Sequence, residues 1–244
     1  MISFIVPAKN EEGYIIDCLE SIFSQRTSEK LEVIMVDNDS SDGTSILVKA
    51  KYPLVKIVEE ALPGTLAARQ RGYKVAQGEV LVFLDADVRL PNAGWLDKLI
   101  EKISSPKVVA VSTHYRYYGL SFHQRLLQTL GTFCFVYPWV YFMNNILHHS
   151  AHLVGGMTAV KKSALDQVDG LGQGTEFFGD EALLCQRLYP LGGIIVSPFL
   201  WVYTSGRRYN KNGMVKTVIQ YLLNYFWVIF AKKPLHKQGY KSVR

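Results

Sequence analysis

Two pairs of acidic residues have the types and spacing to do chemistry. Asp85 and Asp87 directly follow the apolar run of residues 80–84, and Asp180 and Glu181 directly precede an apolar helical segment. Residues i and i+2 of an extended chain point to the same side, so Asp85 and Asp87 can share a divalent cation, Mg²⁺ or Mn²⁺, with a diphosphate. The plain alternatives are solvated turn residues and a helix cap.

The elements that must hold these residues alternate between strand and helix. Apolar runs predict strands over residues 2–6, 31–36, 55–58 and 80–84, and the intervening segments predict helices over residues 11–23, up to about 51, and 66–76. Repeated β-α units predict an α/β fold with a Rossmann-type, mostly parallel sheet that is flanked by helices. In such sheets the ligand chemistry lies at the carboxyl edge.

The second half of the chain departs from this alternation. Its pattern predicts helices over residues 95–103 and 181–188 and a long strand over residues 108–118, in which Thr113, Tyr115 and Tyr117 alternate. A strand over residues 153–160 is broken by Gly155-Gly156, and short strands over residues 194–196 and 200–203 surround Pro198. A glycine such as Gly156 lets the backbone approach a substrate closely, and a β-bulge is the alternative.

Two segments are strongly apolar. Residues 126–160 carry no Asp, Glu, Lys or Arg, and aromatic residues are concentrated in residues 126–147. Because Gly131 and Pro138 interrupt this segment, it predicts a hydrophobic helical insertion over about residues 119–150, partly buried or in a membrane interface. Residues 214–230 predict a C-terminal amphipathic helix, with a thin polar stripe, that is too short to cross a bilayer comfortably.

Charge is distributed unevenly along the chain. The net charge is +6, yet all 21 acidic residues lie within residues 1–181, and residues 182–244 carry ten basic residues and no acid. This pattern favours an anionic partner, a diphosphate or the head groups of an anionic membrane. Nucleic acid is not expected, because no binding motif accompanies the charge. Three scattered cysteines and the absence of a signal-peptide pattern favour a cytoplasmic protein, peripheral on the cytoplasmic face of a membrane if it docks there.

Five stretches taken together resemble the inverting glycosyltransferases of the large family 2, which have the GT-A fold. They occur in the family's order over residues 1–190, and each is modest alone. The stretches are Phe4-Ile5-Val6-Pro7-Ala8-Lys9-Asn10-Glu11-Glu12, Val36-Asp37-Asn38-Asp39-Ser40-Ser41-Asp42-Gly43-Thr44, Ala67-Ala68-Arg69-Gln70-Arg71-Gly72, Asp85-Ala86-Asp87, and Gly179-Asp180-Glu181 through Arg187-Leu188.

The resemblance implies a nucleotide-diphosphate sugar donor and a role for each matching residue. It implies that the nucleotide lies against the loops after the first two strands, where Asn38 stands in place of the family's common Asp. It implies that Asp87 is the direct metal ligand, that Asp85 supports the cation, and that Glu181 is the base with Asp180 as the alternative. The residues implied to contact the nucleotide or its cation are Pro7, Ala8, Asn10, Glu11, Asp37, Asn38, Arg69, Asp85 and Ala86.

Two further groups were singled out from their residue types alone. Arg207 and Arg208 follow the last predicted strand, and two adjacent guanidinium groups in a loop can clamp phosphate oxygens; a solvent-facing basic loop is the alternative. His148, His149 and His152 can add a metal ligand or serve as polar loop residues.

We therefore expect a glycosyltransferase domain over residues 1–210, with a nucleotide-binding half at residues 1–90 and an acceptor half at residues 91–210, followed by an apolar helix and basic tail at residues 211–244. The expected reaction is metal-assisted, inverting sugar transfer to a hydroxyl, a glycan or a lipid-phosphate acceptor. The rival functions are nucleotidyl transfer and non-catalytic nucleotide binding at a membrane. Nucleotidyl transfer is disfavoured because it would need a Gly-rich loop after the first strand, and Pro7–Glu12 is not Gly-rich. Non-catalytic binding is disfavoured because it would not need the two acidic pairs, which are both present.

Overall fold

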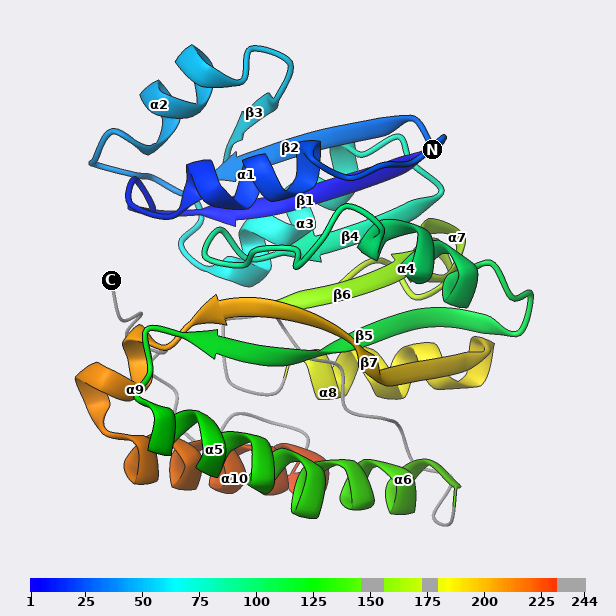
Figure 1. The fold of residues 1–244 in the computed structure, drawn as a ribbon. Coiled ribbons are helices and arrows are strands. Elements are labelled where there is room, and N and C mark those ends of the chain that lie inside the picture. Colours follow the sequence, from blue (N-terminus) through cyan, green and yellow to red (C-terminus); the bar gives the residue numbers. More distant parts are fainter. Residues whose placement is uncertain (146–155, 173–179, 232–244) are drawn as a thin grey trace.

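A seven-stranded sheet forms the centre of the computed structural model, which describes residues 1–145, 156–172 and 180–231 (Figure 1). The strands stand in the order β3-β2-β1-β4-β6-β5-β7. Their bounds are β1 Ile2–Ala8, β2 Leu31–Asp37, β3 Lys56–Glu59, β4 Val80–Leu84, β5 Val108–Tyr118, β6 Met157–Lys161 and β7 Gly193–Ser205.

The expected mostly parallel sheet is confirmed. Among the described strands, only β6 runs antiparallel to its neighbours, β4 and β5. Because β4 and β6 run in opposite directions, the carboxyl end of β4 lies beside the amino end of β6, with Leu84 opposite Met157. The residues that follow β4 therefore meet the residue that precedes β6.

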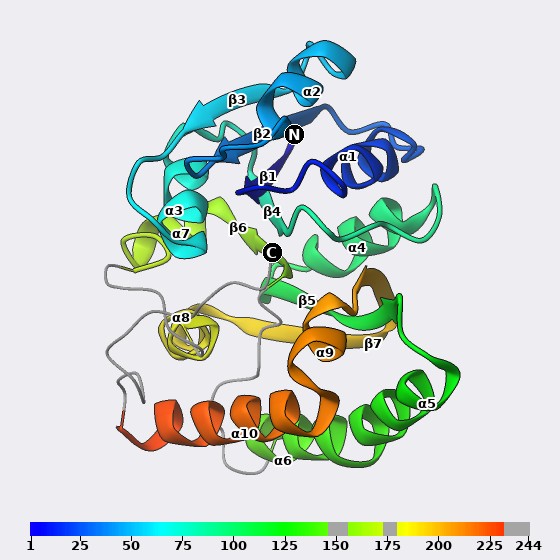
Figure 2. The same ribbon diagram turned by 90° about the vertical axis from the view of Figure 1, so that its left-hand side faces the viewer.

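Helices cover both faces of the sheet, as Figures 1 and 2 show. All of β1 is buried, as expected for a strand that is covered on both faces. Buried residues of α1 and α4 belong to the core on one face, and those of α3, α7 and α8 to the core on the other. These helices, with α2 and the 3₁₀ turn η2, are α1 Ile15–Phe23, α2 Thr44–Lys51, α3 Thr65–Val75, α4 Trp95–Ile103, α7 Lys162–Gln167, α8 Asp180–Leu188 and η2 Tyr189–Leu191.

The apolar segments form a helix layer beyond β7, at the bottom of both views (Figures 1 and 2). We call it the lower helix layer; it consists of α5 Phe122–Gly131, the π-helical turn Thr132–Val136, α6 Tyr137–Asn145 and α10 Met214–Ala231. A capping box of Ser121 and Gln124 starts α5. The predicted helical insertion is thus helical up to residue 145, and residues 146–150 lie outside the described residues. No helix in the described part of the chain is long and apolar enough to cross a membrane.

Two local predictions were wrong. Instead of two short strands around Pro198, β7 is one strand whose register against β5 shifts between Ser197 and Trp201. Pro198 cannot donate a hydrogen bond to the neighbouring strand, so the pairing with β5 is irregular at this point. The strand continues on the far side of the irregularity. Arg207 and Arg208 do not lie in a loop, because they begin the short helix α9 Arg207–Asn212.

The loops after β1 and β2 fasten to each other. Asn10 adopts a left-handed backbone with φ 55°, and its side-chain oxygen accepts from Ser41 N at 2.7 Å. Its own backbone N–H donates to Ser40 Oγ at 3.1 Å. Asn tolerates the left-handed region better than most residues. These bonds fix both loops at the carboxyl edge of the sheet.

Asn38 holds the next loop along the edge. It is buried, and its Nδ2 donates to the carbonyl oxygens of Glu60 at 2.8 Å and Leu62 at 2.7 Å. Its Oδ1 accepts from Gly64 N at 2.7 Å. Both donors of the amide are therefore used by the protein backbone, and an aspartate in this place would set a carboxylate against two carbonyl oxygens.

We expect Asn38→Ala to lower the free energy of unfolding by roughly 1–3 kcal/mol, because it leaves buried backbone groups without partners. Asn38→Asp should cost at least as much. The exposed Asn92, whose side-chain oxygen accepts from Gly94 N, supplies the control Asn92→Ala. Urea unfolding of the three variants tests this, and equal costs for Asn38→Ala and Asn92→Ala would contradict it.

Candidate active site

A first charge network joins three residues from distant parts of the chain. Arg69 of α3 is buried, and its Nη2 lies 2.8 Å from Asp85 Oδ1 at the end of β4. Its Nη1 lies 3.4 Å from Glu181 Oε1 in the first turn of α8. The structure thus brings together a residue implied to face the nucleotide, a residue of the Asp85-Ala86-Asp87 motif and the implied base. Nothing is described of the side chain of Asp180.

A second network lies around Arg207. Its guanidinium makes a two-pronged ion pair with the buried Glu11, with distances of 2.7 Å and 2.9 Å, and its Nη2 lies 3.3 Å from Asp87 Oδ2. The guanidinium also lies over the ring of Tyr14, 4.6 Å from its centroid. Arg207 therefore stands in the site, as the sequence predicted, and its partners in the structure are carboxylates.

The surroundings of Asp87 disfavour its ionised form. Burial raises the pKa of Asp87 to about 7, and the charges of Asp85 and Glu11 push it in the same direction. Arg207 and Arg208 oppose this rise. Near neutral pH the carboxylate is thus poised between its two forms, and added positive charge beside it would favour the ionised form.

The donor set fits a hard cation that is shared with a substrate. Asp85 and Asp87 offer carboxylate oxygens, the ligands that Mg²⁺ and Mn²⁺ prefer. Within residues 1–145, 156–172 and 180–231, no three His, Cys, Asp or Glu side chains could hold a metal ion together. Two carboxylates then leave most coordination positions to diphosphate oxygens and water. The predicted alternative ligands His148, His149 and His152 lie outside the described residues.

The loops after β1 and β2 form the neighbouring wall. Pro7 and Ala8 lie at the end of β1 and pair with Val36 and Asp37 of β2. Asp37 accepts from Ser40 N at 3.0 Å and from the hydroxyl of Ser45. The residues implied to contact a nucleotide thus lie together at one edge of the sheet, although Asn10, Glu11, Asp37 and Asn38 all bond other parts of the protein.

Asp42 of this wall bonds the backbone of both loops. Its Oδ1 accepts from Thr44 N at 3.0 Å at the start of α2, and its Oδ2 accepts from Glu12 N at 3.1 Å. It therefore organises the turn between the two loops.

Gly156 lies against side chains of the protein itself, whereas the sequence had suggested a close approach to a substrate. Its carbonyl oxygen accepts from Asp85 N at 3.0 Å. A Cβ on Gly156 would lie 2.6 Å from Asp85 Oδ2 and would also clash with the hydroxyl of Tyr115. Only glycine allows β6 to start against the carboxylate, whereas Gly155 lies outside the described residues.

Sequence reasoning missed several residues that hold the two aspartates. The hydroxyl of Tyr118 donates to Asp87 O at 2.8 Å, and Cys18 Sγ lies 3.6 Å from Asp85 O. Burial, followed by the charge of Asp85, raises the pKa of Tyr115, so its hydroxyl stays protonated beside the carboxylate. The alternation of Tyr115 and Tyr117 along β5 was a signal in the sequence that could have pointed to Tyr115 as a site residue. No local pattern connects Tyr14 or Cys18 with this site.

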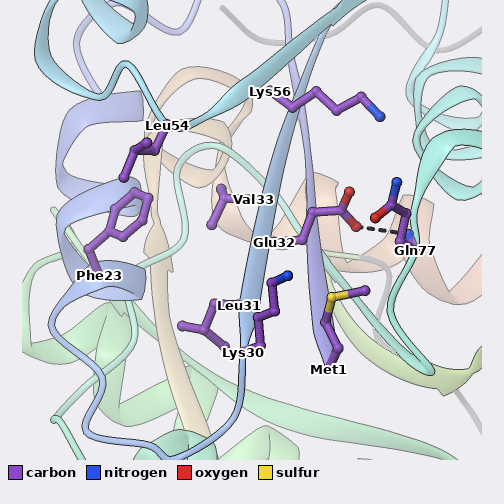
Figure 3. A pocket seen from close by; sticks show the side chains of 9 residues that line it. All are labelled: Met1, Phe23, Lys30, Leu31, Glu32, Val33, Leu54, Lys56 and Gln77. Carbon is purple, nitrogen blue, oxygen red and sulfur yellow. Dashed lines mark hydrogen bonds between the residues drawn. The ribbon is translucent and has the colours of Figure 1, made fainter.

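A separate shallow pocket of about 320 Å³ lies at the opposite, amino edge of the sheet (Figure 3). Its acidic member, Glu32, accepts from Gln77 N at 2.8 Å, the bond drawn in Figure 3. The pocket therefore offers no paired carboxylates. Its lining residues are Met1, Phe23, Lys30, Leu31, Glu32, Val33, Leu54, Lys56 and Gln77.

Solved structures share this architecture. The mannosyltransferase PcManGT from Pyrobaculum calidifontis, in complex with GDP-Man and Mn²⁺, superposes with a TM-score of 0.67 and 26% identity, over 83% of this chain and 56% of its own. Glucosyl-3-phosphoglycerate synthase from Mycobacterium tuberculosis, in complex with Mn²⁺, UDP and glucosyl-3-phosphoglycerate, shares the fold with a TM-score of 0.60 at 23% identity, over 92% of this chain and 79% of its own. The expected GT-A fold is confirmed.

Each of two curated relatives matches a little under half of the chain. The glycosyltransferase AglE of Haloferax volcanii is 36% identical over 112 residues, which are 44% of this chain and 36% of AglE. The dolichol-phosphate mannosyltransferase of Pyrococcus furiosus is 32% identical over 117 residues, 47% of this chain and 33% of that protein. The matches thus span about a third of each relative, 36% and 33%.

The family itself is shown by a longer match. Residues 3–169 match the profile of the family described as Glycosyl transferase family 2. This range includes the loops after β1 and β2, Arg69, the Asp85-Ala86-Asp87 motif and Gly156. The resemblance drawn from the five sequence stretches is confirmed, and the chain belongs to glycosyltransferase family 2.

Proposed function

We propose that this chain transfers a sugar, with inversion, from a nucleotide-diphosphate donor to a hydroxyl or lipid-phosphate acceptor. The observation that carries the proposal is the position of Arg69 between Asp85 and Glu181, at 2.8 Å and 3.4 Å. It sets the implied base close to the strand end where the donor's diphosphate is expected. Family membership and solved relatives in complex with GDP-Man or UDP support the donor class.

Asp87 and Asp85 would hold Mg²⁺ or Mn²⁺ together with the diphosphate. When bound, such a cation neutralises the negative charge that develops on the departing diphosphate. The raised pKa of Asp87 supports this assignment, because burial and the neighbouring acids Asp85 and Glu11 disfavour its ionised form, which a bound cation would favour. The loops with Pro7, Ala8, Asn10 and Asp37 would then line the nucleotide side of the donor.

Arg207 has two carboxylate partners, and Arg208 lies close enough to lower the pKa of Asp87. We propose that these two arginines also face the diphosphate. Their positive charge would then offset the repulsion between Glu11 and Asp87 and would also attract phosphate oxygens.

The proposed chemical step uses Glu181 as the base. Its carboxylate removes the proton of the acceptor hydroxyl while the acceptor oxygen attacks the anomeric carbon. The new carbon–oxygen bond forms on the face opposite the diphosphate, and the bond between the anomeric carbon and the diphosphate oxygen breaks. The configuration of the sugar is therefore inverted, and the nucleoside diphosphate leaves with the electron pair. A lipid-phosphate acceptor, which the name of the Pyrococcus furiosus relative supports, would attack as an anion without this proton transfer.

We expect Asp87→Asn to remove the stabilisation that a donor sugar and Mn²⁺ give the protein. A ligand at a hundred times its dissociation constant raises the free energy of unfolding by about 2.7 kcal/mol, which a thermal shift assay detects. A panel of GDP- and UDP-sugars with Mn²⁺ or with chelator supplies the measurement. Asp97→Asn, at an exposed position of α4, is the control and should keep the shift. Sugar transfer that proceeds undiminished in chelator would rule out the metal role.

In the metal-free protein, the ionisation of Asp87 should lower the free energy of unfolding as the pH rises. Its pKa in the folded protein, about 7, lies above the ordinary aspartate value of 3.8, so between these values the folded state holds a proton that the unfolded state has lost. This contribution is complete below pH 4 and disappears as the pH rises through 7. In chelator, the free energy of unfolding should therefore fall between pH 5 and pH 8 by roughly 1–3 kcal/mol more in wild type than in Asp87→Asn. Urea unfolding at both values measures it, and equal losses would refute it.

Glu181→Gln should lower turnover roughly 10²–10⁴-fold with a hydroxyl acceptor, because an amide cannot accept the proton. Donor stabilisation should remain, whereas Asp180→Asn should reduce turnover less. Glu101→Gln, at an exposed position near the end of α4, is the control. Reversed effects at residues 180 and 181 would assign the base to Asp180, and normal turnover in both variants would exclude the pair.

A further inference from the structure

The lower helix layer exposes apolar side chains that nothing in the described structure covers. Phe135 of the π-helical turn is 75% exposed, Leu127 of α5 is 58% exposed and Leu223 of α10 is 58% exposed. Isolated apolar side chains on a surface are normal, but several on one layer mark a contact surface. The exposed members of this set are Phe122, Leu126, Leu127, Leu130, Phe133, Phe135, Val136, Tyr141, Phe142, Val215, Val218, Ile219, Leu223 and Trp227.

These side chains come from two separate parts of the chain that the fold gathers. Helices α5 and α6 follow β5, whereas α10 follows α9 near the end of the described residues, and Figures 1 and 2 both show them in one layer. No residue of α5 or of the π-helical turn is buried. The apolar composition of these helices is therefore not explained by burial in the core.

The charge of the layer has one sign. Residues 102–165 and 182–231 contain no Asp or Glu, so no acidic side chain occurs in any helix of the layer. Its exposed cations include Arg125 of α5 and Lys216 of α10.

We propose that the lower helix layer docks on the surface of an anionic lipid bilayer. Exposed Phe, Leu and Trp side chains would enter the interface between head groups and acyl chains, and the cations would lie at the level of the anionic head groups. The helices would lie in the plane of the interface. None of them is long and apolar enough, in the described part of the chain, to cross a membrane.

Self-association of the same face is disfavoured by its charge. A twofold interface places the same patch on both subunits, so this layer would bring its cations together without any acid to pair with them. An anionic bilayer meets both properties of the layer, its apolar side chains and its unbalanced positive charge. This docking goes beyond the proposed sugar transfer and does not require it.

Co-sedimentation with vesicles tests the proposal on the full chain. Binding to vesicles of phosphatidylcholine with phosphatidylglycerol should be at least about tenfold stronger than to pure phosphatidylcholine, and it should weaken between about 0.1 M and about 0.5 M NaCl. Phe135→Asp and Leu223→Asp should each reduce the partition coefficient about tenfold or more, because each removes an apolar contact and adds a repelled charge.

Ile46→Asp is the matched control. Ile46 of α2 is 74% exposed, and α2 lies at the other end of the molecule from the lower helix layer (Figure 1). The substitution changes the net charge by the same amount and should reduce binding less than threefold. Far-ultraviolet circular dichroism and the thermal midpoint should show that all three variants are folded.

Three outcomes would overturn the docking surface. The first is that the wild-type chain does not bind anionic vesicles at low salt. The second is that Ile46→Asp weakens binding as much as Phe135→Asp does. The third is that wild type is a dimer which Phe135→Asp dissociates while vesicle binding stays unchanged. Donor stabilisation with Mn²⁺ should persist in Phe135→Asp, and its absence from wild type would count against the sugar-transfer proposal alone.

Discussion

Mutual repulsion among carboxylates is the constraint around which this site is built. Four acidic side chains gather near one sheet edge, and two arginines offset their charge. Arg69 lies between one pair of them and Arg207 between the other, and both guanidinium groups are largely withdrawn from solvent. Removal of Arg69 or Arg207 would take away a guanidinium group that lies between two acidic side chains, and their mutual repulsion would rise where water is scarce. The acids are Glu11, Asp85, Asp87 and Glu181.

The two arginines also connect elements that the sheet does not connect. Arg69 belongs to α3 and reaches α8, and Arg207 belongs to α9 and reaches the loop after β1. The geometry of the site thus depends on the position of α9, which leads directly into α10. A partner that binds α10 would therefore also restrict the position of α9, the helix that carries Arg207. The stacking of Arg207 on Tyr14 adds a contact whose strength does not depend on a carboxylate.

The sequence predicted most where local patterns suffice. The bounds of β4, α4 and β5 were predicted to the residue, because β4 is an apolar run, α4 repeats apolar residues at helical spacing, and β5 starts with β-branched residues and continues with alternating ones. The Asp85-Ala86-Asp87 motif was found for the same reason. Other features depend on packing between distant segments, which no local pattern records. Arg207 pairs with Glu11 across 196 residues, and β7 continues past Pro198 because β5 pairs with it on both sides of the irregularity. The antiparallel pairing of β6 with β4 and β5 likewise joins segments that are distant in the sequence.

The place of β6 has a consequence for how the chain can be divided. Strand β4, which ends the nucleotide-side half, pairs along its full length with β6, which comes from the other half. Residues 1–90 alone would leave β4 as an unprotected edge, ready to pair with another chain. A division of the chain at residue 90 would therefore open the sheet between β4 and β6. During synthesis, β4 stays without this partner strand until the chain has grown to residue 161.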